Sequence, residues 1–292
     1  MNKKTELNLF QRIDKLFDVS SLQNSSVLIV GCGSGGGNVA LQLAMSGVCN
    51  FTLIDDDSIG YENVIRHVCG IRFIGKKKVD ALEEVLLDRN PKIIVKKFDS
   101  NVMKMNRAII NEEIKNSTVV IIATDNDSSR FFINELCVGN NVPHVTARVF
   151  TRGIGGEVFV YRPGEGGCLA CLENILQRTQ FRSGIKEIDL VSDEEKEKMY
   201  GMEIPEIKDS PGLSVDISFI TCFHTRFALD AIANQLSVRP KNMIPINENY
   251  IVWGNRAVSP FSKNFELQRI TLSQQEDCLV CSINNINYNG EA

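Results

Sequence analysis

The chain has 292 residues, of which 43% are hydrophobic and 23% are charged, which suits one large soluble domain or two small ones. Its formal net charge of -4 and its sequence pI of about 5.6 argue against nucleic acid as the main partner. No apolar run approaches the roughly 20 residues that span a bilayer, and the N-terminal MNKKTELNLF lacks the features of a signal peptide. We therefore expect a cytoplasmic protein that makes no membrane contact.

The first half of the sequence alternates between strand-like and helix-like segments. Residues 1–24 are predicted to form a helical arm, because their apolar residues share one helical face, whereas residues 18–26 are polar and loop-like. Strands are then predicted at SVLIV (26–30), FTLID (51–55), IIVKKF (93–98) and TVVIIAT (118–124), with helices at 37–46, 76–88 and 101–115. This alternation predicts a parallel, doubly wound α/β sheet of the Rossmann type.

The pattern changes after Pro143. Two predicted strands, at 144–150 and 155–163, are separated by only a few residues that include glycine, which predicts that the sheet becomes mixed or antiparallel. The polar segment 172–211 is predicted to be a long loop with a short helix. An apolar helix at 213–236 and two closing strands, in NYIVWGN and NFELQRITL, complete the prediction. No linker divides the chain into two domains.

A glycine-rich turn follows the first predicted strand. Gly31, Gly33 and Gly36 form G-x-G-x-x-G between that strand and a helix, a pattern that brings the backbone and the free helix N–H groups close to phosphate oxygens. Asp55 ends the next strand, where an acidic side chain hydrogen-bonds ribose hydroxyls. The pattern predicts a nucleotide site, and a nicotinamide-dependent dehydrogenase is an immediate alternative.

Amide and cationic side chains follow Asp55. Asn63 and Arg66 lie just beyond the second predicted strand, and GKKK at 75–78 opens a helix. A triphosphate carries more charge than the pyrophosphate of a dinucleotide and favours cationic partners, whereas a dehydrogenase needs no such cations here. These residues therefore favour ATP, although at least two of the three lysines are expected to be a solvated helix face.

The segment ATDNDSSR follows the fourth predicted strand. It places Asp125 at the carboxyl end of that strand, beside the crevice of the sheet, where a carboxylate can hold Mg²⁺ between phosphate oxygens. A second interpretation, compatible with the first, is that Asp125 caps the helix that begins near Asn126.

Four of the nine cysteines form two Cys-x-x-Cys pairs, Cys168 with Cys171 and Cys278 with Cys281. Two matched pairs can present four thiolates to one ion, as in a closed structural zinc site. Redox or unpaired thiols are the alternatives, but a redox pair is typical of a thioredoxin-like fold. We favour structural zinc, and we assign it no catalytic role because a closed shell leaves no position for a reacting water.

The remaining cysteines are interpreted as small buried hydrophobic residues, since an odd cysteine count without an export signal argues against a disulfide framework. These residues are Cys32, Cys49, Cys69, Cys137 and Cys222. His144 begins a predicted strand and His224 lies in an apolar helix, so neither is predicted to be a ligand.

These motifs resemble the ThiF/MoeB/HesA family of ubiquitin-activating-enzyme-like adenylyltransferases. The resemblance runs from about Leu9 to Cys281 and consists of an arm with Arg12, GCGSGG, LIDDD, ENVIR, GKKK, ATDN followed by Arg130, and the two cysteine pairs. It implies a single adenylation domain over residues 1–292. Its expected parts are the arm at 1–24, a nucleotide-binding half at 25–150, a zinc- and substrate-binding half at 151–282 with a crossover loop at 172–211, and a flexible tail at 283–292.

The resemblance also implies roles for individual residues. Gly33 and Gly36 would line the phosphates of ATP, Asp55 would bind the ribose, Asn63, Arg66 and Lys78 would contact the triphosphate, Asp125 would hold Mg²⁺, and Gly31, Asp57 and Asn126 would complete the nucleotide site. Lys78 fits the family's Gly-x-x-Lys spacing from Gly75, with Lys77 as the alternative. Arg12 matches an arginine that reaches into the neighbouring subunit of family dimers, which implies a homodimer; otherwise Arg12 is a solvated charge.

The activity that the resemblance implies is attack of a substrate carboxylate on the α-phosphate of ATP, with release of pyrophosphate. The implied partner is a ubiquitin-like or sulfur-carrier protein with a C-terminal glycine tail, or a peptide. Residues 172–211 contain no cysteine, so we expect a separate protein to accept or conjugate the activated group, with Cys222 as an alternative acceptor. The competing hypotheses are an NAD(P)-dependent oxidoreductase, a catalytically idle partner subunit, and adenylation of a carboxylate carried by nucleic acid.

Overall fold

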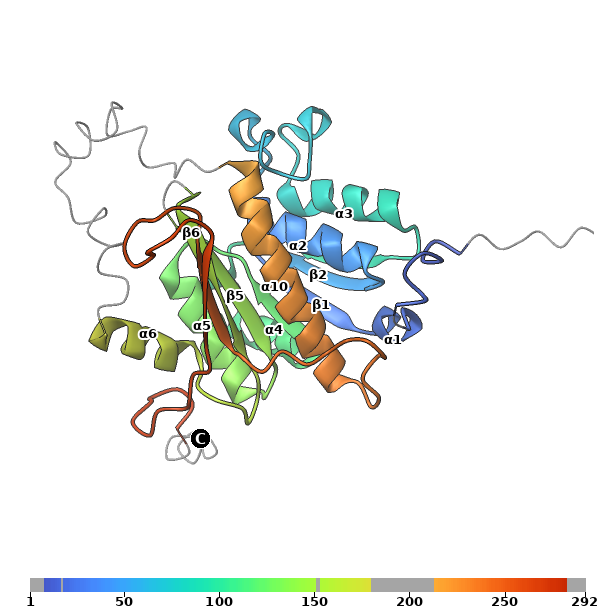
Figure 1. Cartoon of the computed structure of the whole chain (residues 1–292). Coiled ribbons are helices and arrows are strands. Elements are labelled where there is room, and N and C mark those ends of the chain that lie inside the picture. The colour runs from blue at the N-terminus through green and yellow to red at the C-terminus, as the bar shows by residue number, and fades with distance from the viewer. Residues whose placement is uncertain (1–7, 17, 151–152, 180–212, 283–292) are drawn as a thin grey trace, which may run out of the picture.

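The computed structural model describes residues 8–16, 18–150, 153–179 and 213–282, and these build one eight-stranded sheet in the order β3-β2-β1-β4-β5-β6-β7-β8 (Figure 1). Strands β1 to β5 are mutually parallel, and β6, β7 and β8 are each antiparallel to the strand before them. The strands are β1 (Ser26–Val30), β2 (Asn50–Ile54), β3 (Ile94–Phe98), β4 (Val119–Ile122), β5 (His144–Val149), β6 (Gly155–Tyr161), β7 (Tyr250–Gly254) and β8 (Glu266–Ile270). The predicted change from a parallel to an antiparallel half is confirmed.

Helices cover both faces of the sheet, as a doubly wound fold requires. One face carries α2 (Ser34–Met45), α3 (Lys78–Arg89) and α10 (Ser214–Gln235), and the other carries α4 (Arg107–Lys115), α5 (Asp127–Gly139) and α6 (Leu169–Arg178) (Figure 1). The short elements are α1 (Ser20–Gln23), η1 (Tyr61–Asn63), η2 (Ile71–Phe73) and η3 (Val102–Lys104). None of the helices in the described ranges combines the length and apolar character needed to cross a bilayer.

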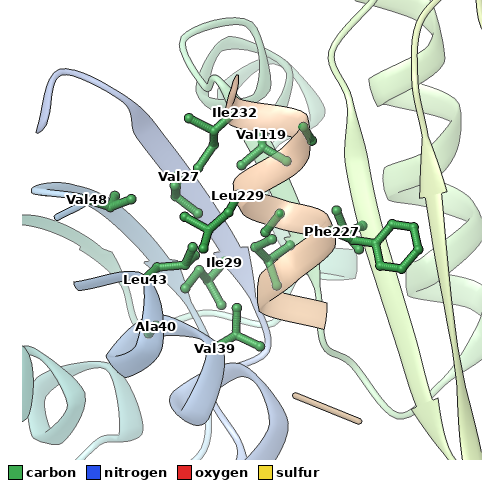
Figure 2. Packing of buried hydrophobic residues seen from close by; sticks show 14 of the residues in the cluster. Val27, Ile29, Val39, Ala40, Leu43, Val48, Val119, Phe227, Leu229 and Ile232 are labelled. Carbon is green, nitrogen blue, oxygen red and sulfur yellow. The ribbon is translucent and has the colours of Figure 1, made fainter. Parts of the chain in front are cut away.

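The central strand β1 is apolar on both sides because both faces are covered. Its Val27 and Ile29 join the cluster under α2 and α10, whereas its alternate residues join the cluster under α4 and α5. Figure 2 shows Leu229 and Ile232 of α10 among Val27 and the other side chains of the first cluster. Helix α10 therefore ties the antiparallel half of the sheet to the nucleotide-binding half.

The arm predicted over residues 1–24 does not form a continuous helix in its described part. Residues 8–16 fold into turns, and the helix α1 falls within the stretch predicted to be a loop. Leu9 and Leu16 are 59% and 58% exposed and Ile13 is only partly buried, so the described residues leave much of the apolar face on which the prediction depended uncovered. Helix α1 begins where the Asp18 carboxylate accepts a hydrogen bond from the Ser20 N–H at 3.0 Å.

Helix α6 takes the first residues of the segment predicted as a crossover loop at 172–211. It continues to Arg178 because Leu172 and Leu176, one helical turn apart, are buried against the sheet. Residues 180–212 of that predicted loop, and the predicted tail at 283–292, lie outside the described residues. The helix predicted at 101–115 is likewise divided, since the side chains of Asn101 and Asn106 cap η3 and α4 separately.

The three histidines of the chain are all buried. Burial lowers the pKa of His144 to about 3 and the pKa of His224 to about 4, and it also lowers the pKa of His67. Each ring is therefore neutral in the folded protein near neutral pH, whereas an unfolded chain binds a proton at each ring below about pH 6.5.

We predict that the free energy of unfolding is greatest above about pH 6.5 and decreases as the pH falls below that value. The unfolded chain then binds more protons than the folded one, and each histidine adds up to about 1.4 kcal/mol per pH unit to the slope. Urea unfolding at several pH values between 7.5 and 5 measures this slope, and the variant His144→Gln should show a shallower one. A flat profile over that interval would contradict the buried neutral rings.

Candidate active site

A cavity of about 870 Å³ lies at the carboxyl ends of β1, β2, β4 and β5. It is the switch point of the sheet, because the chain leaves β1 for α2 on one face and leaves β4 for α5 on the other. Most of the predicted site residues line it: Gly31, Gly33, Asp55, Asp57, Asn63, Arg66, Lys78, Asp125 and Asn126. Gly36 and Arg12 are not among the lining residues.

The three glycines of the turn after β1 have different structural roles. Gly31 has a φ of +93°, and a Cβ there would approach the Ala123 carbonyl oxygen to 2.7 Å, so the position favours glycine. Gly33 faces open space on the cavity wall. Gly36 lies beneath the turn, where a Cβ would collide with the Gly31 carbonyl. Gly36 therefore lets the start of α2 pack closely against the turn, and it does not line the cavity.

Asp55 holds the glycine turn to the end of β2. Its carboxylate accepts hydrogen bonds from the Cys32 N–H at 2.7 Å and from the Asp57 N–H at 2.9 Å. Lys78 lies opposite, with its Nζ 2.6 Å from an Asp57 carboxylate oxygen and 4.0 Å from an Asp55 oxygen. The predicted ribose ligand and the predicted triphosphate ligand are therefore neighbours.

Lys78 is the lysine of 76–78 that lines the cavity, as the Gly-x-x-Lys spacing indicated. Its side chain is 13% exposed, whereas those of Lys76 and Lys77 are 39% and 40% exposed. Lys76 pairs with Glu84, and Lys77 pairs with Asp99 at 3.0 Å.

His67 is a site residue that the sequence analysis missed. Its Nδ1 accepts a hydrogen bond from the Cys69 N–H at 3.0 Å, so its Nε2 carries the proton and donates to the Cys32 carbonyl at 2.8 Å. The ring thereby joins the glycine turn to the segment that carries Asn63 and Arg66. Its position directly after Arg66 was the available signal.

The loop after β4 presents Asp125 to the cavity. Asn126 caps α5, because its side-chain oxygen accepts from the Ser129 N–H at 2.9 Å. Arg130 donates to the Thr124 carbonyl at 2.6 Å and lies 3.1 Å from an Asp127 carboxylate oxygen. Asp125 is exposed, and its one hydrogen bond among the described residues is a 3.4 Å contact from the Asn126 amide. The helix-capping role thus belongs to Asn126, which leaves the Asp125 oxygens open to the cavity.

The four cysteines of the Cys-x-x-Cys pairs meet in one buried cluster. Their sulfur atoms all lie within 4.8 Å of one another, with Cys168 and Cys278 at 3.7 Å and Cys171 and Cys281 at 3.5 Å. Four sulfurs bound to one tetrahedral zinc ion at 2.3 Å would lie about 3.8 Å apart. The cluster therefore fits a structural zinc ion, which would link α6 to a turn 110 residues further along the chain.

The prediction that all five other cysteines are buried is wrong for Cys222. Cys32, Cys69 and Cys137 are buried and Cys49 is partly buried, but Cys222 is exposed on α10. The apolar composition of α10 concealed this, because the described part of the chain covers the first half of the helix on one face only, as its exposed Phe219 also shows. His224, which was not predicted to be a ligand, lines the cavity and makes a 3.0 Å hydrogen bond with the Val145 carbonyl.

The doubly wound sheet, the glycine turn at its switch point and the cations beside it are the features of a nucleotide-binding α/β protein. A family model described as "ThiF family" matches residues 5–242. The chain therefore belongs to the ThiF family, as the resemblance of its motifs implied.

Comparison with curated proteins gives relatives of moderate identity. The chain is 33% identical to the sulfur carrier protein ThiS adenylyltransferase of Escherichia coli over 153 residues, 52% of this chain and 59% of that protein. It is 26% identical to ubiquitin-like modifier-activating enzyme 5 of Caenorhabditis briggsae over 198 residues, 63% of this chain and 46% of that protein. These matches thus span about half the length of the relatives.

Among solved structures, the fold is similar to that of E. coli MccB with ATP. The TM-score is 0.67 at 21% identity, over 96% of this chain and 76% of MccB. A structure of MccB with AMPCPP and MccA matches equally well, with a TM-score of 0.67. At this identity the likeness supports the shared fold, including the mixed eight-stranded sheet.

Proposed function

We propose that this chain is an adenylyltransferase that activates the C-terminal carboxylate of a small protein or peptide by transferring AMP to it from ATP. The observation that carries the proposal is the convergence of four kinds of group on one cavity: the open backbone at Gly33, the cations of Arg66 and Lys78, the carboxylate of Asp55 beside the turn, and the exposed carboxylate of Asp125. A dinucleotide site requires the first and third of these but not the others.

The reaction must bring two anions together. A carboxylate oxygen of the substrate forms a bond to the α-phosphorus, the bond from that phosphorus to the oxygen bridging to the β-phosphorus breaks, and pyrophosphate leaves with the electron pair. Arg66 and Lys78 offset the charge of the triphosphate, and the cavity holds both reactants in place. Lys78 can change partners, because the Asp57 side chain it contacts is 68% exposed.

Asp125 is the proposed magnesium ligand. Its carboxylate lies on the cavity wall, and its 3.4 Å contact with the Asn126 amide leaves oxygen lone pairs for a cation. When bound, Mg²⁺ would neutralise phosphate charge. Asn126 and Asn63 are the proposed amide groups of the nucleotide site, and both line the cavity.

The proposed partner is a ubiquitin-like or sulfur-carrier protein with a C-terminal glycine tail, or a peptide. The support comes from the names of the relatives, which include a ThiS adenylyltransferase and a ubiquitin-like modifier-activating enzyme, and from the MccB structures that contain MccA. We propose a separate acceptor protein for the activated group. We also propose a homodimer in which Arg12, which is exposed and does not line the cavity of its own chain, reaches the partner's site.

We predict that Asp125→Asn lowers carrier-dependent ATP–pyrophosphate exchange by at least about 100-fold. The Mg²⁺ ion would lose its carboxylate ligand, and the phosphate charge would then be less well neutralised in the transition state. Exchange is measured with radiolabelled pyrophosphate and a panel of glycine-tailed carrier proteins and peptides. The matched control is Asp88→Asn, which neutralises an exposed carboxylate on α3 away from the cavity. Tight binding of a nicotinamide dinucleotide without any exchange would instead support the oxidoreductase, and binding of neither nucleotide would support an idle subunit.

We further propose that the four-cysteine cluster holds one structural zinc ion. The prediction is one zinc per chain by elemental analysis, falling to nearly zero in Cys278→Ser, with a lower melting temperature because the link between α6 and the 278–281 turn is lost. The matched control is Cys222→Ser, which removes an exposed thiol outside the cluster and should retain the metal. A wild-type protein purified without chelators and free of zinc would refute the assignment.

A further inference from the structure

Two carboxylates stand at the start of α5, and they are in different situations. Asp125 and Asp127 both line the cavity and are both exposed. Asp125 makes no ion pair among the described residues, whereas Asp127 is paired with two arginines. The structure therefore engages one carboxylate and leaves the other open.

The two arginines reach Asp127 from different elements. Arg130 lies 3.1 Å from an Asp127 oxygen, but it is three residues further along the same helix. Arg148 lies 2.8 Å from that oxygen and comes from β5. A contact within one helix cannot fix that helix to the sheet, so Arg148 is the group that ties the first turn of α5 to β5.

Arg148 also forms ion pairs with two buried carboxylates, in addition to its pair with Asp127. Glu157 is its cross-strand neighbour on β6, with the Arg148 Nε at 3.4 Å, and Glu173 on α6 lies 3.0 Å from its Nη2. The Tyr250 hydroxyl donates to Glu157 at 2.7 Å, which fixes the orientation of that carboxylate. The Arg148 side chain is only 20% exposed, and its Nε and Nη2 atoms both lie beside these acids. An incoming substrate carboxylate would compete with three acids for this guanidinium, so the arrangement favours a structural role over binding of substrate. We call the ion pair between Arg148 and Asp127 the latch.

We propose that Arg148 is a positioning residue of the adenylation site, acting through Asp127 so that Asp125 is the carboxylate presented to the magnesium-bound triphosphate. The inference rests on the proposed function. The latch has two effects: it fixes the loop of residues 124–126 relative to the glycine turn, and it neutralises a second carboxylate two residues from Asp125. Without it, Asp127 keeps only Arg130 of its own helix as an ion-pair partner among the described residues, so its carboxylate is less fully neutralised, is no longer tied to β5, and can compete for the cation beside the phosphates.

The test is the dissociation constant of ATP, measured by calorimetry with and without Mg²⁺. We expect Arg148→Met to weaken binding about tenfold with Mg²⁺ and less than about twofold without it, since the glycine turn, Arg66 and Lys78 remain intact. In a chain that already carries Asp127→Asn, the further change Arg148→Met should leave the Mg²⁺-dependent gain in ATP affinity unchanged, because the carboxylate through which Arg148 acts on the cation has been removed, although Glu157 and Glu173 still lose their partner. Arg107→Met is the matched control, since Arg107 forms an exposed 2.6 Å pair with Glu135 away from the cavity.

Three results would overturn the inference. The first is Arg148→Met with wild-type affinity for ATP in the presence of Mg²⁺. The second is an equal loss of affinity with and without Mg²⁺, or a loss that persists unchanged beside Asp127→Asn, since either indicates a general structural role. The third is a wild-type affinity that does not depend on Mg²⁺. If Arg148→Met fails to fold, Arg148→Lys replaces it, with a smaller Mg²⁺-dependent loss expected and an unchanged affinity contradicting the latch.

Failure of the proposed function is a separate outcome. A wild-type chain that binds no ATP under either condition would refute the adenylation site itself. A wild-type chain that binds ATP more tightly with Mg²⁺, combined with an unaffected Arg148→Met variant, would preserve the proposed function and refute only the latch.

Discussion

The chain leaves β1 and β4, two neighbouring parallel strands, toward opposite faces of the sheet, and the rest of the site depends on that divergence. The departure of the connections opens a space at the carboxyl ends of the strands, which side chains from the following loops line. Helices α2 and α5 both begin at this space, so their free N–H groups favour anions there. The long helix α10 closes one side with Ile217, Ile220 and His224.

Charge is distributed unequally across the cavity. On the side of β1 and β2, Arg66 and Lys78 line the cavity together with the glycine turn, and the Lys78 pair with the exposed Asp57 can be exchanged for a ligand. On the side of β4 and β5, Arg130 and Arg148 are engaged by carboxylates. The Lys78 pair on the first side is suited to open for an anionic ligand, whereas Arg148 on the second, which buried Glu157 and Glu173 also engage, is suited to hold protein groups in place. This division agrees with a reaction in which the protein mainly positions two anions.

The parts of the fold that could be predicted from the sequence are those with a local cause. The strand β1 was recognisable because burial on both faces demands a continuous apolar run, and the glycine turn because Gly31 has a backbone that other residues rarely adopt. The sequence also predicted that the two cysteine pairs lie together, because each pair alone supplies only two of the four ligands of a structural zinc site. Lys78 was distinguished from Lys77 only by a spacing taken from the family, and the structure brings Lys78 to the cavity.

The parts that could not be predicted depend on partners distant in the sequence. The helix expected in the arm needs a surface to cover Leu9 and Leu16, and no described part of the chain supplies one. Exposure of Cys222 depends on which face of α10 meets the sheet. The role inferred for Arg148 depends on the cross-strand register with Glu157 and on the packing of Glu173 in α6. A charged residue at the end of a buried strand was the local signal, but it does not identify the groups that it contacts.

The central claim is that a substrate carboxylate attacks the α-phosphorus of ATP, and oxygen transfer tests it most directly. A carrier protein or peptide whose C-terminal carboxylate is labelled with ¹⁸O is incubated with the enzyme, ATP, Mg²⁺ and a nucleophilic acceptor, and the phosphate products are analysed by mass spectrometry. Because the acceptor cleaves the bond between the acyl carbon and the bridging oxygen, the account predicts one ¹⁸O atom in the released AMP and none in pyrophosphate. Label in orthophosphate together with ADP, or turnover that leaves AMP unlabelled, would contradict it.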